Sequence, residues 1–201
     1  MNEQYARSLL IDTCRRLYDR NLTVSAGGNM SMRVDDYILI TPSGRNKGLL
    51  REDELVKMSL DGKVLAGGKP SIEHRFHLAL YNKRPEVNAI VHCHPLYCTT
   101  LAVIGKKINT NLTPEGVLLL GDVPMIPYYT PGSDELMKAV EEHSQYDAML
   151  MAKHGALTQG KDIEEAYNRM EELEFQAHMQ LLAKRARNLP KAEIQKIRGM
   201  L

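Results

Sequence analysis

Two histidines two residues apart are the first residues in this sequence whose types and spacing could do chemistry. His92 and His94 lie in the segment 87–95, whose apolar residues predict a β-strand. Side chains alternate between the faces of a strand, so both imidazoles project from one face and can reach one metal ion. Cys93 projects from the opposite face and is interpreted as a core residue. The pair alone also fits two partly buried, hydrogen-bonded histidines.

A third imidazole follows another apolar segment. His154 comes directly after the strand predicted at 148–152 and precedes Gly155. Three imidazoles with one open position are typical of a catalytic rather than a structural zinc centre. Taken alone, His154 fits an ordinary turn histidine better than a metal ligand, so the metal site is a hypothesis that rests on all three histidines together.

Glu73 is a candidate for proton transfer. It lies at the start of a helix predicted from Pro70, where carboxylates often only complement the helix dipole. Beside a metal-polarised carbonyl, the same side chain would remove or return the proton on the adjacent carbon. Sequence spacing does not choose between these two roles.

Three short segments have the composition of an anion-binding site. The segment 27–29 is Gly-Gly-Asn, 41–44 is Thr-Pro-Ser-Gly, and Ser71 lies near a predicted helix start. Their backbone N–H groups and hydroxyls can bind an anion, and each is equally compatible with a turn or a cap. Neither glycine segment matches a Walker loop or a dinucleotide fingerprint.

The elements that must position these residues alternate between strands and helices. Apolar residues at three- and four-residue spacing predict a helix over 3–20, and Asp61-Gly62 predicts a hairpin turn between strands at 55–59 and 63–65. Further strands are predicted at 30–34, 37–41, 87–94 and 148–152, and further helices at 70–84, 133–143, 162–187 and 191–201. The alternation predicts an α/β fold, with residues 1–201 forming a single layered domain.

Composition excludes several classes of protein. The 201 residues include 26 Lys and Arg against 25 Asp and Glu, with the signs interspersed, so no basic surface favours nucleic acid or a membrane. The apolar runs are far shorter than the roughly 20 residues that span a bilayer. Cys14, Cys93 and Cys98 form no even disulfide framework, which favours a reducing compartment such as the cytoplasm.

Six separated motifs have the order and spacing of one family. They are Gly27-Gly28-Asn29, Thr41-Pro42-Ser43-Gly44, Pro70-Ser71-Ile72-Glu73-His74-Arg75-Phe76-His77, His92-Cys93-His94, Val123-Pro124-Met125-Ile126-Pro127-Tyr128 and His154-Gly155. Through them the chain resembles the class II aldolase/adducin head family, and its pattern is most similar to that of L-fuculose-1-phosphate aldolases. Their joint occurrence is far more specific than any one motif.

The resemblance implies a central, mostly antiparallel sheet flanked by helices, and a homotetramer with active sites at subunit interfaces. It implies one Zn²⁺ per subunit, held by His92, His94 and His154, and Glu73 as the acid/base residue; cobalt, manganese and iron also suit such ligands. The residues implied to bind the phosphate of a small sugar phosphate are Gly28, Asn29, Ser43, Gly44 and Ser71. The implied reaction is reversible cleavage of a ketose 1-phosphate to dihydroxyacetone phosphate and an aldehyde.

The chain departs from the fuculose pattern mainly on the aldehyde side of the substrate. Ile72 replaces a second serine of the phosphate site, and Thr113 replaces a tyrosine that acts on the aldehyde-side hydroxyl. The tail also lacks a tyrosine segment of that pattern. Glu115, Tyr128 and Tyr129 are candidate replacements for the missing polar groups.

Other members of the family offer alternative functions. Sugar-phosphate 4-epimerases, dehydratases and decarboxylases share the metal face, whereas adducin heads use the fold for assembly without a metal. Retention of the three histidines and Glu73 favours an enzyme. The other histidines, His74, His77, His143 and His178, are interpreted as helix residues without a role in metal binding.

Overall fold

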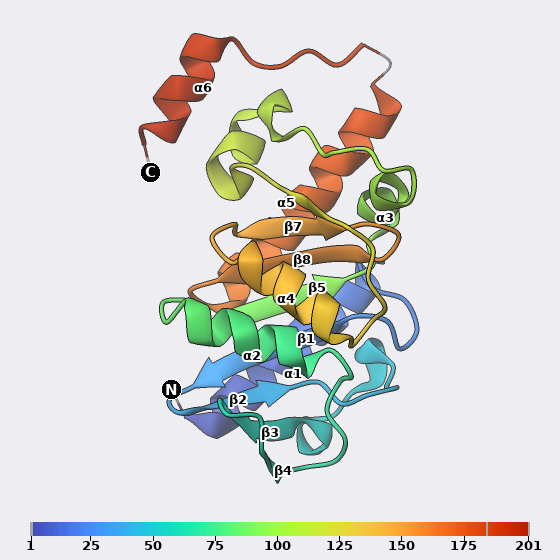
Figure 1. Cartoon of the computed structure of the whole chain (residues 1–201), viewed down its shortest axis with the longest axis vertical. Coiled ribbons are helices and arrows are strands. Elements are labelled where there is room, and N and C mark those ends of the chain that lie inside the picture. Colours follow the sequence, from blue (N-terminus) through green and yellow to red (C-terminus); the bar gives the residue numbers. More distant parts are fainter. Residues whose placement is uncertain (1, 184, 201) are drawn as a thin grey trace.

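The computed structural model, which describes residues 2–183 and 185–200, is built around one eight-stranded sheet (Figure 1). The strands are β1 (Asn29–Val34), β2 (Tyr37–Ile40), β3 (Val56–Ser59), β4 (Val64–Ala66), β5 (Ala89–Cys93), β6 (Met125–Ile126), β7 (Ala148–Met151) and β8 (Gly155–Gly160). Their order is β4-β3-β2-β1-β5-β8-β7-β6, and every neighbouring pair is antiparallel except β6 and β7. The predicted α/β fold with a mostly antiparallel sheet is confirmed.

Helices cover both faces of this sheet. They are α1 (Glu3–Asp19), α2 (His74–Lys83), α3 (Leu96–Val103), α4 (Asp134–Glu142), α5 (Ile163–Leu182) and α6 (Lys191–Arg198). In Figure 1, α2 and α4 lie in front of the sheet, with α1 and α5 behind it. Two apolar cores result, one on each face of the sheet.

Strand parity assigns the residues of β5 to these two cores. Val91 and Cys93 belong to the core under α1, α3 and α5, whereas Ile90 belongs to the core under α2 and α4. His92 therefore shares the face of Ile90, and Cys93 is fully buried on the other face, as predicted. The three cysteines, all within the described residues, are buried and unpaired.

Three predicted boundaries were wrong. The helix predicted from Pro70 begins at His74, because Pro70 forms a β-bridge with Pro42 and the Ser71 N–H donates to the Thr41 carbonyl at 3.2 Å. The long helix ends at Leu182 rather than at 187. The terminal helix spans Lys191–Arg198, and Leu201, included in the prediction, lies outside the described residues.

Strand β8 and helix α3 are among the elements that were not predicted from the sequence. Strand β8 is buried throughout but contains Thr158 and Gln159, whose side chains donate to carbonyls of Ala166, Ser144 and Tyr146 at 2.7–2.8 Å. These polar residues broke the expected apolar pattern, although the Thr158 hydroxyl and the Gln159 amide nitrogen are both hydrogen-bonded.

Helix α3 was missed because the sequence near its start contains no capping signal. Its first N–H groups, those of Tyr97 and Cys98, donate to the Glu174 carboxylate of α5 at 2.9 and 2.8 Å. A capping group so distant in sequence leaves no local signal. None of the described helices is long and apolar enough to cross a membrane.

Candidate active site

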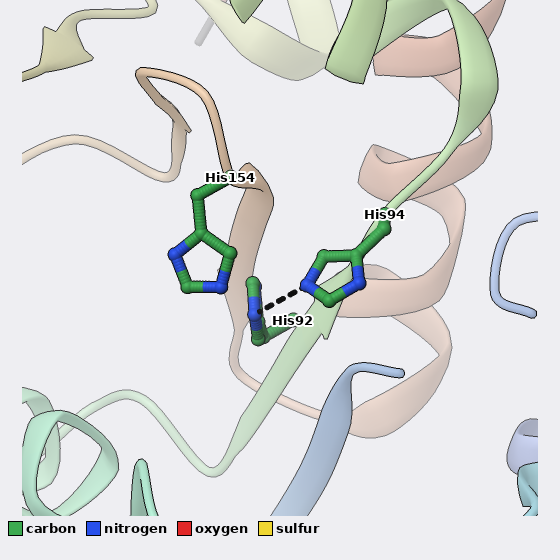
Figure 2. Close-up of side chains that lie close together, drawn as sticks. All are labelled: His92, His94 and His154. Atoms are coloured by element: carbon green, nitrogen blue, oxygen red, sulfur yellow. Dashed lines mark hydrogen bonds between the residues drawn. The ribbon is translucent and has the colours of Figure 1, made fainter. Parts of the chain in front are cut away.

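Strand pairing brings the three histidines together. His92 and Cys93 are the last two residues of β5, and His94 follows directly. His154 lies in the turn between β7 and β8. Cys93 pairs with Ala156 on β8, so the turn that carries His154 lies beside His94. Figure 2 shows the three imidazole rings facing one another, and their candidate ligand atoms all lie within 4.8 Å of one another.

The hydrogen bonds of these rings fit a divalent metal ion. His92 Nδ1–H donates to the Ala156 carbonyl at 2.8 Å, which leaves the lone pair on Nε2. That nitrogen lies 3.2 Å from His94 Nε2, and His154 Nδ1 is buried without a hydrogen-bond partner among the described residues. Three convergent imidazoles are the donor set of a catalytic zinc centre, so these residues fit the metal that the family implies.

The pKa values of two imidazoles, those of His94 and His154, are lowered, which favours the neutral state that metal binding requires. Burial, and then the neighbouring His92 and His154, lower the pKa of His94 to about 3. Burial and His92 lower the pKa of His154 to about 4. A metal ion therefore need not displace a proton from either ring near pH 7.

Glu73 lies against this cluster. It was predicted in the first turn of its helix, but in the structure it is the N-cap residue, one position before α2 begins. Its Oε2 accepts from Asn29 Nδ2 at 2.8 Å and lies 3.3 Å from His92 Nε2, while Oε1 lies 3.3 Å from His154 Nε2. Burial raises the pKa of Glu73, but the two histidines and the Asn29 amide lower it below the usual range. The structure thus holds a buried carboxylate anion beside the three imidazoles.

The five predicted anion-binding residues line one cleft of about 320 Å³. They are Gly28, Asn29, Ser43, Gly44 and Ser71. Glu73, His94 and His154 line the same cleft, so an anion bound by these loops would lie close to the three histidines. The bridge between Pro42 and Pro70 brings the second and third segments together.

Gly28 permits a close backbone approach in this cleft. Its φ is +70°, and a Cβ there would lie 2.5 Å from the His92 carbonyl oxygen. Any other residue would therefore push β1 away from the histidine strand. This requirement explains one glycine of the Gly-Gly-Asn segment.

Lys47 is a cleft residue that the sequence analysis missed. Its side chain is 2% exposed, and Nζ donates to the carbonyls of Ala26 and Arg45, both at 2.9 Å. Burial lowers its pKa. Its position three residues after Gly44 was the available signal.

His77 was interpreted as a plain helix residue, and this interpretation was incomplete. The residue lies on α2 but is fully buried, and its Nε2 contacts Asn29 Oδ1 at 2.5 Å. Its spacing of four residues from Glu73, which places both on one helix face, was the available signal. Three further histidines lie on helices or at a helix end and do not belong to the group formed by the candidate metal ligands. They are His74, His143 and His178.

The residues that depart from the fuculose pattern have different locations. Ile72 lines the cleft and is 51% exposed. Thr113 lies beside α5, where its Oγ1 accepts from Gln176 Nε2 at 2.6 Å. Glu115, Tyr128 and Tyr129 do not line the cleft in the described part of this single chain.

The burial of His77 predicts a pH-dependent stability. Burial, and next His92, lower its pKa to about 3, whereas an unfolded histidine titrates near 6.5. Between these values the unfolded chain binds a proton that the folded chain does not. The free energy of unfolding of metal-free protein should therefore fall with decreasing pH by up to about 1.4 kcal/mol per unit from this residue.

Urea unfolding with a chelator between pH 7.5 and 4.5 would measure this loss. His94 and His154 contribute in the same direction, since their pKa values are also lowered. The His77→Gln variant should show a shallower slope than the parent. A wild-type stability that is constant from pH 6.5 to 4.5 would contradict the prediction.

A family of known proteins and several of its enzymes are similar to this chain. Residues 8–181 match the model of the class II aldolase and adducin N-terminal domain. An L-fuculose phosphate aldolase of Methanocaldococcus jannaschii is 42% identical over 86% of this chain and 93% of that protein. A 3-oxo-tetronate 4-phosphate decarboxylase of Haemophilus influenzae is 37% identical over 89% of this chain and 88% of that protein.

Two solved structures are also similar to this chain. YgbL from Escherichia coli, a candidate aldolase/epimerase/decarboxylase, superposes with a TM-score of 0.93 at 34% identity, covering 98% of this chain and 99% of that one. An L-fuculose 1-phosphate aldolase superposes with a TM-score of 0.92 at 29% identity, covering 100% and 97%.

Proposed function

Because this chain belongs to the class II aldolase and adducin N-terminal domain family, whose enzymes are metal-dependent lyases, we propose that it is a zinc-dependent aldolase. It would reversibly cleave a ketose 1-phosphate, like L-fuculose 1-phosphate, to dihydroxyacetone phosphate and an aldehyde. One observation carries the proposal: three imidazoles converge beside the buried Glu73 carboxylate, and Glu73, His94 and His154 line one cleft together with a set of anion-binding loops.

His92, His94 and His154 would hold the ion, one per subunit. Bound there, a divalent metal would act as a Lewis acid that polarises the substrate ketone and stabilises the enediolate charge. The chain contributes by lowering the pKa values of His94 and His154, which favours their neutral rings, and by fixing the tautomer of His92 through the Ala156 carbonyl.

Glu73 would move the proton. When the bond between C3 and C4 breaks, its electron pair stays on C3, and the Glu73 carboxylate takes the C4 hydroxyl proton, giving the aldehyde. The carboxylic acid so formed at Glu73 then supplies this proton to C3, and in the synthetic direction the carboxylate removes it from C3 and returns it to the aldehyde oxygen. The Asn29 amide, donating at 2.8 Å, holds the carboxylate in place for this task.

The anion-binding loops would hold the phosphate. Gly28 and Gly44 have positive φ, and the hydroxyls of Ser43 and Ser71 lie in the same cleft as the Asn29 amide. The buried Lys47 ammonium adds positive charge at this end. Ile72 at the rim supplies no hydroxyl, which reduces the number of donors available to the anion.

A decarboxylase is the second candidate, favoured by the decarboxylase relative that matches 89% of this chain. Loss of CO₂ from a 3-oxo-tetronate 4-phosphate leaves the bond electrons on the carbon next to the ketone. Protonation of that carbon also gives dihydroxyacetone phosphate. The two reactions thus share an enediolate and a product, and they need the same metal, carboxylate and phosphate site.

The deciding experiment assays ketose 1-phosphates and 3-oxo-tetronate 4-phosphate with metal-loaded and chelated protein. Metal-dependent release of dihydroxyacetone phosphate with an equimolar aldehyde supports the aldolase. Release with CO₂ from the tetronate alone identifies the decarboxylase. An epimer or a dehydrated product without fragments would assign those branches of the family, and a protein that binds no metal would favour an adducin-type assembly role.

We further propose that the enzyme is a cytoplasmic homotetramer with its sites at subunit interfaces. Supporting this, Leu96, Val103, Ile104, Phe175 and Leu182 are large apolar side chains, each more than half exposed, on or at the ends of α3 and α5. Three buried, unpaired cysteines suit a reducing compartment. Light scattering of the purified protein tests the assembly, and a stable monomer would exclude it.

A further inference from the structure

We propose that His77 is a positioning residue that orients the Asn29 side chain so that its amide nitrogen, not its oxygen, faces Glu73. The proposal rests on the acid/base role proposed for Glu73. It concerns a residue that neither lines the cleft nor belongs to the group of three candidate metal ligands. It is carried by a continuous chain of buried hydrogen bonds that begins at the Glu73 carboxylate.

Five side chains form this chain, which we call the α2–β1 relay. Glu73 Oε2 lies 2.8 Å from Asn29 Nδ2, and Asn29 Oδ1 lies 2.5 Å from His77 Nε2. His77 Nδ1 lies 2.7 Å from Ser31 Oγ, which lies 2.7 Å from Tyr81 OH. Each of the five residues is at most 6% exposed, so water does not replace these bonds.

The relay follows from two regular spacings. Glu73, His77 and Tyr81 are four residues apart, so they occupy one face of α2 and its N-cap. Asn29 and Ser31 are two residues apart on β1 and share one face of that strand. The helix face packs on the strand face, so helix and strand residues alternate along the relay.

The chemistry of the groups gives the relay one direction. A carboxylate only accepts, so Asn29 must present its NH₂ group to Glu73 and its oxygen to His77. His77 must then donate from Nε2 and accept at Nδ1. The Ser31 hydroxyl donates to Nδ1 and accepts from Tyr81. Every donor is paired with an acceptor only if the His77 proton is on Nε2.

His77 therefore decides which end of the Asn29 amide faces the carboxylate. Without the Nε2 donor, the Asn29 oxygen is buried and unpaired, and rotating the amide would set that oxygen against Glu73. Either outcome moves or destabilises the carboxylate beside His92 and His154. Phe76, stacked on the His77 ring at 4.8 Å and 17°, holds the ring plane.

Two variants of His77 separate orientation from packing. In His77→Gln, the side-chain amide can donate to Asn29 from about the position of Nε2, whereas His77→Leu fills the space without a donor. With metal-loaded protein we expect the kcat for dihydroxyacetone phosphate release to fall about 10–100-fold in His77→Leu and to stay within about threefold in His77→Gln. KM and metal content should change little in both.

Tyr81→Phe is the matched control. It removes the last hydroxyl of the relay but leaves the bond from Ser31 to His77 Nδ1, so the kcat should stay within about threefold of the wild type. Equal losses in Tyr81→Phe and His77→Leu would show a merely structural cluster and overturn the proposal, as would a wild-type kcat in His77→Leu.

A second measurement is independent of the reaction and of the folding of any variant. Imidazole ¹⁵N chemical shifts of the wild-type protein report the tautomer of each histidine, and His77 should be protonated on Nε2 alone. Protonation on Nδ1 would overturn the proposal even if the aldolase reaction is confirmed. The Nε2 tautomer in a protein without aldolase activity would instead disprove only the proposed function.

Discussion

Replacing Glu73 by glutamine is expected to lower turnover by about 10²–10⁴-fold while the protein keeps its metal. Glutamine has nearly the shape of glutamate, so the packing at the start of α2 should persist, but an amide neither accepts nor returns the proton. The carboxylate is 6% exposed and within 3.3 Å of His92 and His154 nitrogens, so no other described carboxylate is placed to replace it.

Initial rates of dihydroxyacetone phosphate release and the metal content of the same preparation would test this expectation. Glu141→Gln is a matched control, because Glu141 lies on α4 and lines a different surface pocket. A fully active Glu73→Gln protein would remove Glu73 from the mechanism. Loss of the metal together with activity would show that the carboxylate supports the ion instead of moving a proton.

His94→Ala is expected to abolish both metal binding and turnover. His94 Nε2 lies 3.2 Å from His92 Nε2, and its removal leaves two imidazoles where a catalytic zinc centre uses three protein ligands. After dialysis, the metal content should fall from about one to well below one equivalent per chain, and activity should fall with it.

Elemental analysis and the aldol cleavage assay measure the two losses, and circular dichroism checks that the variant is folded. His143→Ala serves as the control, because His143 is the C-cap of α4 and its Nδ1 donates to the Ala139 carbonyl at 2.8 Å, away from the metal cluster. A His94→Ala protein that retains stoichiometric metal would refute the assignment of this ligand.

The metal half of the site favours neither candidate reaction, since aldol cleavage and decarboxylation both use it. Discrimination must come from the part of the substrate beyond the enediolate. Ile72 lies on the cleft rim, and Thr113 lies beside α5 outside the cleft of a single chain. In either proposed reaction, the aldehyde or carboxylate end of the substrate would be recognised by groups other than the tyrosine of the fuculose pattern, which is why product analysis comes first.

Local periodicity in the sequence predicted most of the helices and strands, though not β8 and α3, and the direction of many side chains. The three- and four-residue spacing of Leu10, Cys14 and Leu17 predicted the buried stripe of α1, and two-residue spacing placed His92 opposite Cys93 on β5. The resemblance to one family supplied the set of candidate residues. All five anion-binding candidates line the cleft beside the histidines and Glu73.

Only the tertiary structure decided which distant segments meet. The pairing of Cys93 with Ala156 places His154 beside His94, and the bridge between Pro42 and Pro70 delays the start of α2, leaving Glu73 at the N-cap. Periodicity shows which face a side chain occupies, but it contains no information on the strand or helix that covers that face. For this reason His77 was interpreted as an ordinary helix residue from the sequence, and only the packing of α2 on β1 shows its contact with Asn29.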